Sequence, residues 1–266
     1  MSNRIPNAFH LGPDAPPVPI VYLDDAVVAV DKPSGLLAIP DRWDKGLPSL
    51  MSRLNAGILV GAGWAVSGGY TYLANAHRLD RDTTGVMILG RSPATLRNLV
   101  RQFEDRGVAK VSLALIRGSL PEAEITVDRP VGPDPARPGF AHAGGRGSKH
   151  AVTVFKRLEA FRGYELVECR PQTGRMHQIR VHLQTLRCPL VADERYGDGK
   201  GLFLSKIKRG YKGDREAERP LVGRQGLHAL SVDLLHPVTG DPLHIEAPWP
   251  KDLRIALKYL RQFAGM

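Results

Sequence analysis

Charged residues gather in the run 77–85, which reads HRLDRDTTG and directly precedes the apolar segment 86–89. Within it, Asp80 lies between Arg78 and Arg81, and neighbouring cations favour the ionised form of a carboxylate. An ionised carboxylate held in this way can act as a nucleophile, while the two arginines attract an anionic ligand. The spacing fits a salt-bridged turn that caps the strand equally well, so both interpretations stay open from the spacing alone.

A second run, 170–183, reads RPQTGRMHQIRVHL. Thr173-Gly174 is predicted to start a helix with Arg175 in its first turn, and the free N–H groups of such a terminus bind phosphates. A basic residue where the helix dipole favours acids indicates a negatively charged partner, and a solvated helix face is the less favoured alternative. His177 and His182 are five residues apart and therefore lie on different helix faces, which favours bonded or RNA-facing histidines over a metal pair.

Other chemical motifs are weak or missing. Lys32-Pro33-Ser34-Gly35 can be explained as the end of a strand, and the chain has no Gly-rich phosphate loop, dinucleotide fingerprint, serine-hydrolase elbow or His-Glu-x-x-His pair. The two cysteines, Cys169 and Cys188, exclude a disulfide scaffold and a multi-thiolate metal site within the chain. We therefore expect neither a metal nor a nucleotide cofactor.

The composition favours a nucleic-acid partner. The 266 residues include 37 basic and 27 acidic side chains, which gives a formal net charge of +10. Arginine leads this excess, and its guanidinium binds phosphate in a bidentate manner, although codon bias also raises arginine content. No apolar run approaches the roughly 20 residues of a membrane span, and the Pro-rich start lacks the core of a signal peptide. We expect a cytoplasmic protein with no membrane contact.

Hydrophobic periodicity predicts an α+β fold with a mixed sheet, because strands and helices interleave without regular alternation. A Pro-rich arm at 1–19 precedes one domain at 20–266, in which 193–224 is a basic excursion and 128–148 a surface loop. Strands are predicted at 20–23, 26–30, 86–89, 108–116, 151–155, 164–168, 227–235 and 243–247. Helices are predicted near 49–54, from 93 to 106 after the cap Ser92, from 173 onward, and at the C-terminus around 253–260.

Five ordered blocks carry a family resemblance. The run 77–85 resembles the His-Arg-Leu-Asp-x-x-Thr-Ser-Gly signature of the RluA-type pseudouridine synthases, and Asp31–Gly35 resembles their Asp-Lys-Pro-x-Gly strand end. The segment 173–183 resembles their Thr-Gly-Arg-x-His-Gln-Ile-Arg-Val-His-Leu block. Further matches are Pro189, Asp193 and Tyr196-Gly197, then 227–229, then 236–240. Together the blocks cover about residues 20 to 250.

The resemblance implies a mainly antiparallel sheet with a central catalytic cleft flanked by helices, and isomerisation of uridine to pseudouridine in RNA without a cofactor. The family's catalytic aspartate falls on Asp80. No S4-like RNA-binding module is expected before the domain. One departure stands out, because Ser112 occupies the position of the family tyrosine that lies beside the target base. Serine has neither a stacking ring nor a pKa near neutrality.

We expect Asp80 to attack the nucleotide, Arg175 to pair with it, and Arg78 to fill the place of the everted base or to grip a phosphate. The target uridine is expected in a loop or distorted stem of ribosomal or transfer RNA, where base extrusion costs least. A monomer without an obligate protein partner is expected. The other predicted RNA contacts are basic or imidazole side chains: Arg81, His177, Arg180, Lys206, Lys208 and Arg209.

Two other functions remain open. Because Ser112 replaces the tyrosine, the chain is alternatively a catalytically impaired RNA-binding or assembly factor on the same fold. A carboxylate-based hydrolase needs a second catalytic acid near Asp80, and the one sequence-adjacent candidate, Asp82, is interpreted as a turn-capping residue.

Overall fold

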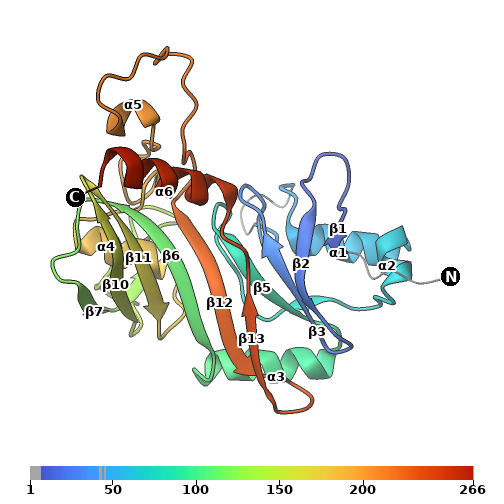
Figure 1. The fold of residues 1–266 in the computed structure, drawn as a ribbon. Coiled ribbons are helices and arrows are strands. Elements are labelled where there is room, and N and C mark those ends of the chain that lie inside the picture. Colours follow the sequence, from blue (N-terminus) through green and yellow to red (C-terminus); the bar gives the residue numbers. More distant parts are fainter. Residues whose placement is uncertain (1–6, 42–43, 45, 266) are drawn as a thin grey trace. The chain divides into compact units, whose positions relative to one another are not determined.

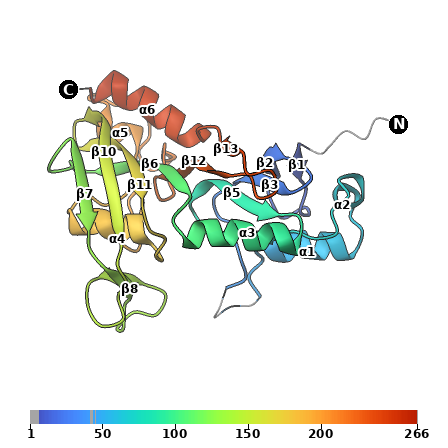
Figure 2. The ribbon, with the colours of Figure 1, turned by 90° about the horizontal axis from the view of Figure 1, so that it is seen from below.

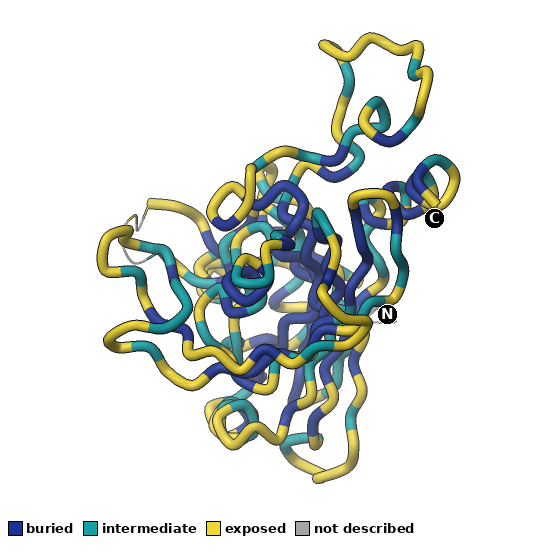
Figure 3. The backbone as a smooth tube through the Cα atoms, turned by 90° about the vertical axis from the view of Figure 1, so that its left-hand side faces the viewer, coloured by how far each residue is buried: buried dark blue, intermediate teal, exposed yellow. Residues whose placement is uncertain are grey.

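The computed structural model describes residues 7–41, 44 and 46–265, which form two compact units (Figure 1). The first unit comprises Met1–Ala109 and Ala229–Pro248, and the second comprises Lys110–His228 and Trp249–Met266. Each is built around strands whose residues are mostly buried, while the connecting loops are mostly exposed (Figure 3). The mainly antiparallel α+β fold predicted from the sequence is confirmed.

The first unit contains a sheet in which every pairing with a resolved register is antiparallel. Its strands follow the order β1 (Ala8–Phe9), β2 (Val18–Leu23), β3 (Val27–Lys32), β5 (Thr84–Gly90) and β12 (Leu227–Leu235). Two more strands, β4 (Ala74–Asn75) and β13 (Pro242–Glu246), pair with β5 and β12. All seven residues of β5 are buried, as its continuous apolar sequence predicts.

Helices cover both faces of this sheet. Alternate residues of a strand point to opposite faces, so the apolar run that begins β3 places apolar side chains on both. On one face, Val28 and Val30 of β3 pack with residues of α1 (Leu50–Leu59), which is followed by the short α2 (Gly63–Ser67). On the other, Val27 and Ala29 pack with residues of α3 (Pro93–Glu104). In Figure 2, α3 runs along this sheet. Ser92 caps α3 and Pro93 opens it, as predicted.

In the second unit, neighbouring strands pair antiparallel in the order β6 (Ala109–Arg117), β11 (Tyr164–Pro171), β10 (Val152–Phe161) and β7 (Glu124–Asp128). Ala114 and Ile116 of β6 share a core with Leu183 of α4 (Gln178–Thr185). The short α5 (Leu204–Ile207) contacts the C-terminal helix α6 (Lys251–Phe263).

Part of the expected surface loop at 128–148 is a hairpin, so that prediction is wrong. Strands β8 (Val131–Pro133) and β9 (Ala141–Ala143) pair with each other, and Val131 and Ala141 are buried. The N–H of Ala141 donates to the Tyr196 hydroxyl at 2.8 Å. The segment is rich in glycine and proline, which are typical of loops, and its few buried apolar residues do not form a recognisable strand pattern in the sequence.

The helix predicted from residue 173 begins at Gln178 instead, so Arg175 lies in the preceding loop and not in a first helical turn. The reason is local. His177 adopts a left-handed conformation with φ 55°, which breaks helical geometry, and the Gln178 side chain bonds to residues of the loop. Residues 173–175 therefore do not form the phosphate-binding helix N-terminus that the sequence predicts.

Two other segments are more ordered than the sequence pattern indicates. Within the Pro-rich arm, Phe9 of β1 is fully buried in the first unit's core. Within the basic excursion 193–224, α5 forms, and buried Leu202 and Val222 bridge to each other. Along the described chain, none of the helices combines the length and the apolar character needed to cross a bilayer.

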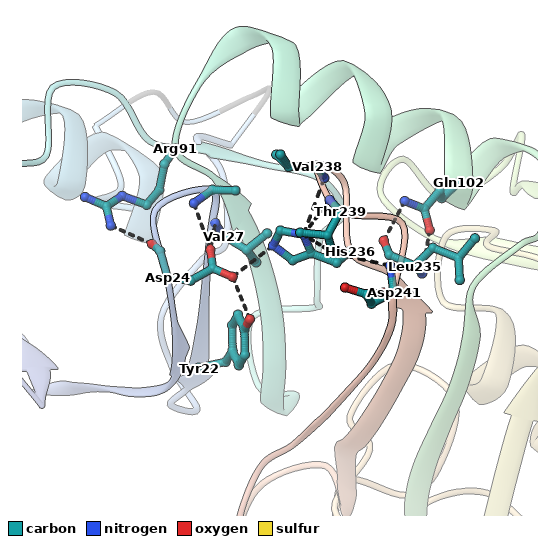
Figure 4. A network of polar contacts seen from close by, with 11 residues as sticks. Tyr22, Asp24, Val27, Arg91, Gln102, Leu235, His236, Val238, Thr239 and Asp241 are labelled. Atoms are coloured by element: carbon teal, nitrogen blue, oxygen red, sulfur yellow. Dashed lines mark hydrogen bonds and ion pairs between the residues drawn. The ribbon is translucent and has the colours of Figure 1, made fainter.

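A polar network fastens the β2–β3 turn to the β12–β13 turn in the first unit (Figure 4). The Asp24 carboxylate accepts hydrogen bonds from the Tyr22 hydroxyl at 2.5 Å, from His236 Nε2 at 2.9 Å and from the N–H of Val27 at 2.7 Å. On its other side, His236 Nδ1 accepts the N–H of Thr239 at 3.1 Å. One carboxylate thus connects segments more than 200 residues apart in sequence.

We predict that Asp24→Ala lowers the free energy of unfolding by about 2 kcal/mol at pH 7, because its bonded donors lose their acceptor. Burial raises the pKa of Asp24, but hydrogen bonds from Tyr22 and the backbone outweigh it and lower the pKa below its usual value. The stabilisation is therefore present above about pH 4 and is lost as the pH falls through the native-state pKa.

Thermal unfolding of wild type and variant at pH 7 and pH 3 measures this difference. Asp25→Ala is the matched control, because Asp25 is exposed, and it should change stability by less than about 0.5 kcal/mol. An Asp24→Ala effect that is equal at both pH values would contradict the assigned role of the ionised carboxylate.

Candidate functional site

Asp80 lies half-buried in a turn that leads into β5. Its carbonyl accepts the N–H of Thr83 at 3.2 Å, which closes the turn. Gly85 then has φ 114°, and a Cβ atom at this position would lie 2.0 Å from the Ala229 carbonyl oxygen. Only glycine fits here, so the glycine that ends the run 77–85 has a steric cause.

The turn is fastened to the run 31–35 by Lys32, whose side chain is fully buried. Its Nζ donates to the carbonyls of Pro33, Leu36 and Arg81 at 2.7 to 2.8 Å. The N–H of Gly35 also donates to the Arg81 carbonyl at 3.1 Å, and Arg81 Nε donates to the Gly35 carbonyl at 3.2 Å. Two stretches that were singled out separately in the sequence therefore form one structure beside Asp80.

His77, at the other end of the run, serves the fold. Its Nε2 accepts the N–H of Ile88 at 3.1 Å, and its ring stacks on Phe103 with centroids 4.6 Å apart. Arg78 and Arg81 are exposed on either side of Asp80. In the first unit, half-buried Asp80 therefore lies in the chain between two exposed arginines.

In the second unit, Gln178 organises the loop 173–177. Its Oε1 accepts the Thr173 hydroxyl at 2.8 Å and the N–H of Arg175 at 3.0 Å. Its Nε2 donates to the Val152 carbonyl at 3.0 Å. The Arg175 side chain is half-buried, and its Nε donates to the His150 carbonyl at 3.0 Å. The backbone on both sides of Gly174 is therefore fixed by one buried amide.

Arg180 is buried and forms a two-pronged ion pair with Asp193, at 2.8 and 2.9 Å. Burial raises the pKa of Asp193, but the hydrogen bonds from Arg180 and the backbone outweigh it and lower the pKa. The guanidinium also lies over the ring of Tyr196, whose hydroxyl bonds to His177 Nδ1 at 2.7 Å. These contacts tie α4 to the start of the segment 193–224.

Ser112 lies on β6 opposite Cys169 and is only 8% exposed. Asp80 belongs to the first unit, while Ser112 and Arg175 belong to the second, and the loop 173–177 brings Arg175 and His177 together. The basic residues of the excursion differ in exposure. Lys206 and Arg209 are exposed, whereas Lys208 lies over the ring of Phe263 at 5.2 Å.

Within the described residues, no group of three His, Cys, Asp or Glu side chains could hold a metal ion.

Sequence reasoning missed two organising residues, Lys32 and Gln178. A lysine at the end of a strand that begins with four apolar residues is an unusual placement and is the available signal, although the end of a strand is enough to explain the run 32–35. Nothing in the spacing identifies Gln178, because glutamine in a helix is unremarkable without its partners. The sequence predicts a bonded or RNA-facing histidine at His182, and its nitrogens contact Thr153 Oγ1 and the Arg129 carbonyl.

The chain is similar to known proteins in sequence and in fold. Residues 26–185 match the model of the RNA pseudouridylate synthase family. The chain is similar to the ribosomal large subunit pseudouridine synthase D of Xanthomonas campestris, with 36% identity over 95% of this chain and 72% of the relative. It is also similar to synthase C of Salmonella typhi, with 35% identity over 92% of this chain and 70% of the relative.

A relative from Neisseria meningitidis, named synthase D, is 33% identical, and this chain spans 64% of it. Among solved structures, human RNA pseudouridylate synthase domain containing 4 has a TM-score of 0.70 and 26% identity, covering 93% of this chain and 94% of that one. Because the family model spans more than half of the chain and the relatives exceed 30% identity, the chain belongs to the RNA pseudouridylate synthase family and is an isomerase.

Proposed function

We propose that this protein converts a uridine of large-subunit ribosomal RNA to pseudouridine, with Asp80 as the nucleophile. The observation that carries the proposal is the fixed turn at Asp80, in which buried Lys32 and Gly85 leave the backbone little freedom. The choice of RNA rests on the names of the relatives, which are ribosomal large subunit synthases. Transfer RNA is the alternative substrate.

The reaction breaks the N1–C1′ bond, turns the base and joins C5 to C1′. It needs a nucleophile, a stabilised negative charge and removal of the C5 proton, and no net redox change occurs. Asp80 supplies the nucleophile, and the exposed Arg78 and Arg81 beside it attract the phosphates of the target nucleotide. A turn held by side-chain bonds keeps the attacking carboxylate in a defined place, which lowers the entropy cost of reaction.

Arg175 is the proposed charge partner of Asp80. Its backbone is fixed by Gln178, but its side chain remains half-buried and bonded through Nε to a carbonyl. Arg180 has a different proposed role, because its guanidinium is already committed to Asp193. It positions the loop 173–177 from α4 and supports RNA contact by His177 indirectly.

RNA binding is proposed to rest on exposed basic side chains. Lys206 and Arg209 are exposed near α5, whereas Lys208 has part of its charge engaged with Phe263. Phosphate contacts by such side chains release counterions, which makes binding sensitive to salt. A cytoplasmic, monomeric enzyme remains the expectation from the sequence.

Ser112 favours a second function, that of an RNA-binding or assembly factor with weakened chemistry. The serine is nearly buried and faces Cys169 across the sheet. It offers no ring for stacking on a base. The two functions differ in whether the purified protein releases the C5 proton of uridine.

We predict that Asp80→Asn reduces tritium release from RNA containing [5-³H]uridine by at least about 10³-fold, because the amide is a poor nucleophile. Asp82→Asn is the comparison, and it should retain activity within about tenfold if Asp82 only caps the turn. Full activity of Asp80→Asn would refute the nucleophile, and equal loss in both variants would favour a two-carboxylate mechanism.

We predict that Lys32→Met destabilises the protein by at least about 3 kcal/mol, because three carbonyls lose the charged donor that the fully buried lysine supplies. Urea unfolding measures the loss. Among folded molecules at low temperature, turnover should fall more than RNA affinity, since the turn at Asp80 loosens. Lys258→Met, an exposed substitution on α6, is the control. Wild-type stability in Lys32→Met would contradict the role of the ammonium.

We predict that RNA affinity falls steeply between 50 and 200 mM salt and that Arg209→Ala reduces the slope of log K against log salt by about 0.7 to 0.9, the value of one phosphate contact. Filter binding over a salt series measures both slopes. Arg254→Ala removes the same charge from an exposed position of α6 and should leave the slope unchanged. Identical slopes for both variants would argue against a contact at Arg209.

A further inference from the structure

Lys110 stands two residues before Ser112 on β6, so the two side chains leave the strand on the same face. Further along this face, Ala114 and Ile116 pack in the core that contains Leu183 of α4. Lys110 therefore lies at the end of the face that carries Ser112, on the side of the sheet where α4 packs. Lys110 has no role in the proposed steps at Asp80 and Arg175.

The amine of Lys110 lies against the loop that carries Arg175. Its Nζ donates to the Thr173 carbonyl at 3.4 Å, a long bond, and a Cβ atom added to Gly174 would lie 3.9 Å from Nζ. No described carboxylate of the second unit lies within ion-pair distance of this nitrogen, although the side chain is partly buried. A lysine set inside a protein without a counter-ion has a weakened preference for the charged form.

Burial lowers the pKa of Lys110, because desolvation penalises the ammonium form. The ionisable groups on the neighbouring elements do not compete with it as bases. Arg175 bonds to the His150 carbonyl, and Arg170 on β11 pairs with Glu168. Cys169 is fully buried, and burial raises its pKa well above the usual value, so it stays a thiol.

The chemistry requires a base at this point. When C5 of the everted uracil bonds to C1′, C5 still carries its hydrogen. The C5–H bond must then break, with its electron pair returning to the ring to restore the double bond, while N1 gains a proton from solvent. A serine hydroxyl is far too weak a base for this step near neutral pH.

On these grounds we infer that Lys110 is a catalytic residue that accepts the C5 proton on Nζ, in the place left by the tyrosine that Ser112 replaces. The inference rests on the proposed synthase function. The neutral amine takes up the proton, becomes an ammonium and returns it to solvent before the next turnover. Atoms and charge balance without any further reactant.

The test is single-turnover conversion of RNA with protium or deuterium at C5 of uridine, for wild type, Lys110→Met and Lys110→Arg. Both variants should slow pseudouridine formation by about 10² to 10⁴-fold, since neither side chain is a base at neutral pH. The C5 isotope effect should increase in both. The wild-type rate should rise with pH as the amine deprotonates, and this rise should vanish in Lys110→Met.

RNA affinity should stay within twofold in each variant, which separates this role from phosphate binding. Adding Ser112→Tyr to Lys110→Met should restore at least tenfold in rate, which a purely structural role of the lysine would not produce. Lys156→Met, at an exposed position of β10, should behave as wild type.

A wild-type rate in Lys110→Met would overturn the inference. A wild-type rate in Lys110→Arg would also overturn it, because it would show that a positive charge is enough at this position. If Lys110→Met does not fold, the arginine variant and the wild-type pH profile decide. If the wild type itself forms no pseudouridine, the proposed function is refuted. In that case wild type and Asp80→Asn are equally inactive, which separates this outcome from a failure of the Lys110 inference alone.

Discussion

A single buried ammonium group holds the turn that carries Asp80. Lys32 Nζ is removed from water and is held by three carbonyl oxygens, one of which belongs to Arg81, 49 residues away in sequence. A buried charge without such bonds is strongly destabilising, so any movement of the Arg81 carbonyl away from Nζ is costly. The backbone beside Asp80 is thereby fixed by electrostatics. Secondary structure alone leaves such a turn free, because residues 80–83 precede β5 and make no ladder bonds of their own.

In the second unit, a neutral side chain, instead of a charged one, fixes the loop that carries Arg175. A neutral amide, Gln178, fixes the loop at Arg175, and a buried ion pair between Arg180 and Asp193 holds α4 to the chain that follows it. An amide carries no charge, so its desolvation costs less than that of Lys32, and it can both donate and accept. In each unit, the loop that carries a proposed site residue, Asp80 or Arg175, is fixed by a buried side chain that has no proposed role in the reaction. This is the preorganisation that a reaction in a fixed geometry needs.

The regular elements could be predicted from the sequence because their residues repeat a local pattern. The cap at Ser92 and the apolar run at 86–89 placed α3 and β5 to within two residues. The predictions failed where a contact distant in sequence overrides the local pattern. A left-handed His177 delays α4 to Gln178, and Tyr196 supports a hairpin whose glycines and prolines indicate a loop. The run of charges around Asp80 and Arg175 is enough to predict them as site residues, whereas Lys32 and Gln178 are evident only from their partners.

The effect of Ser112 on activity cannot be judged from that position alone. Taken alone, it predicts lost chemistry, because a hydroxyl replaces a phenol. The neighbouring side chain on the same face of the strand, however, is that of Lys110. Its amine is partly buried and has no carboxylate partner among the described residues of the second unit. The reaction requires a base within reach of C5 and does not require that it be a tyrosine. Since burial alone brings an amine toward the neutral form, a lysine on a partly buried strand end can supply this basicity without any additional residue. The replacement at Ser112 is therefore compatible with an active enzyme, provided that the burial of Lys110 is kept.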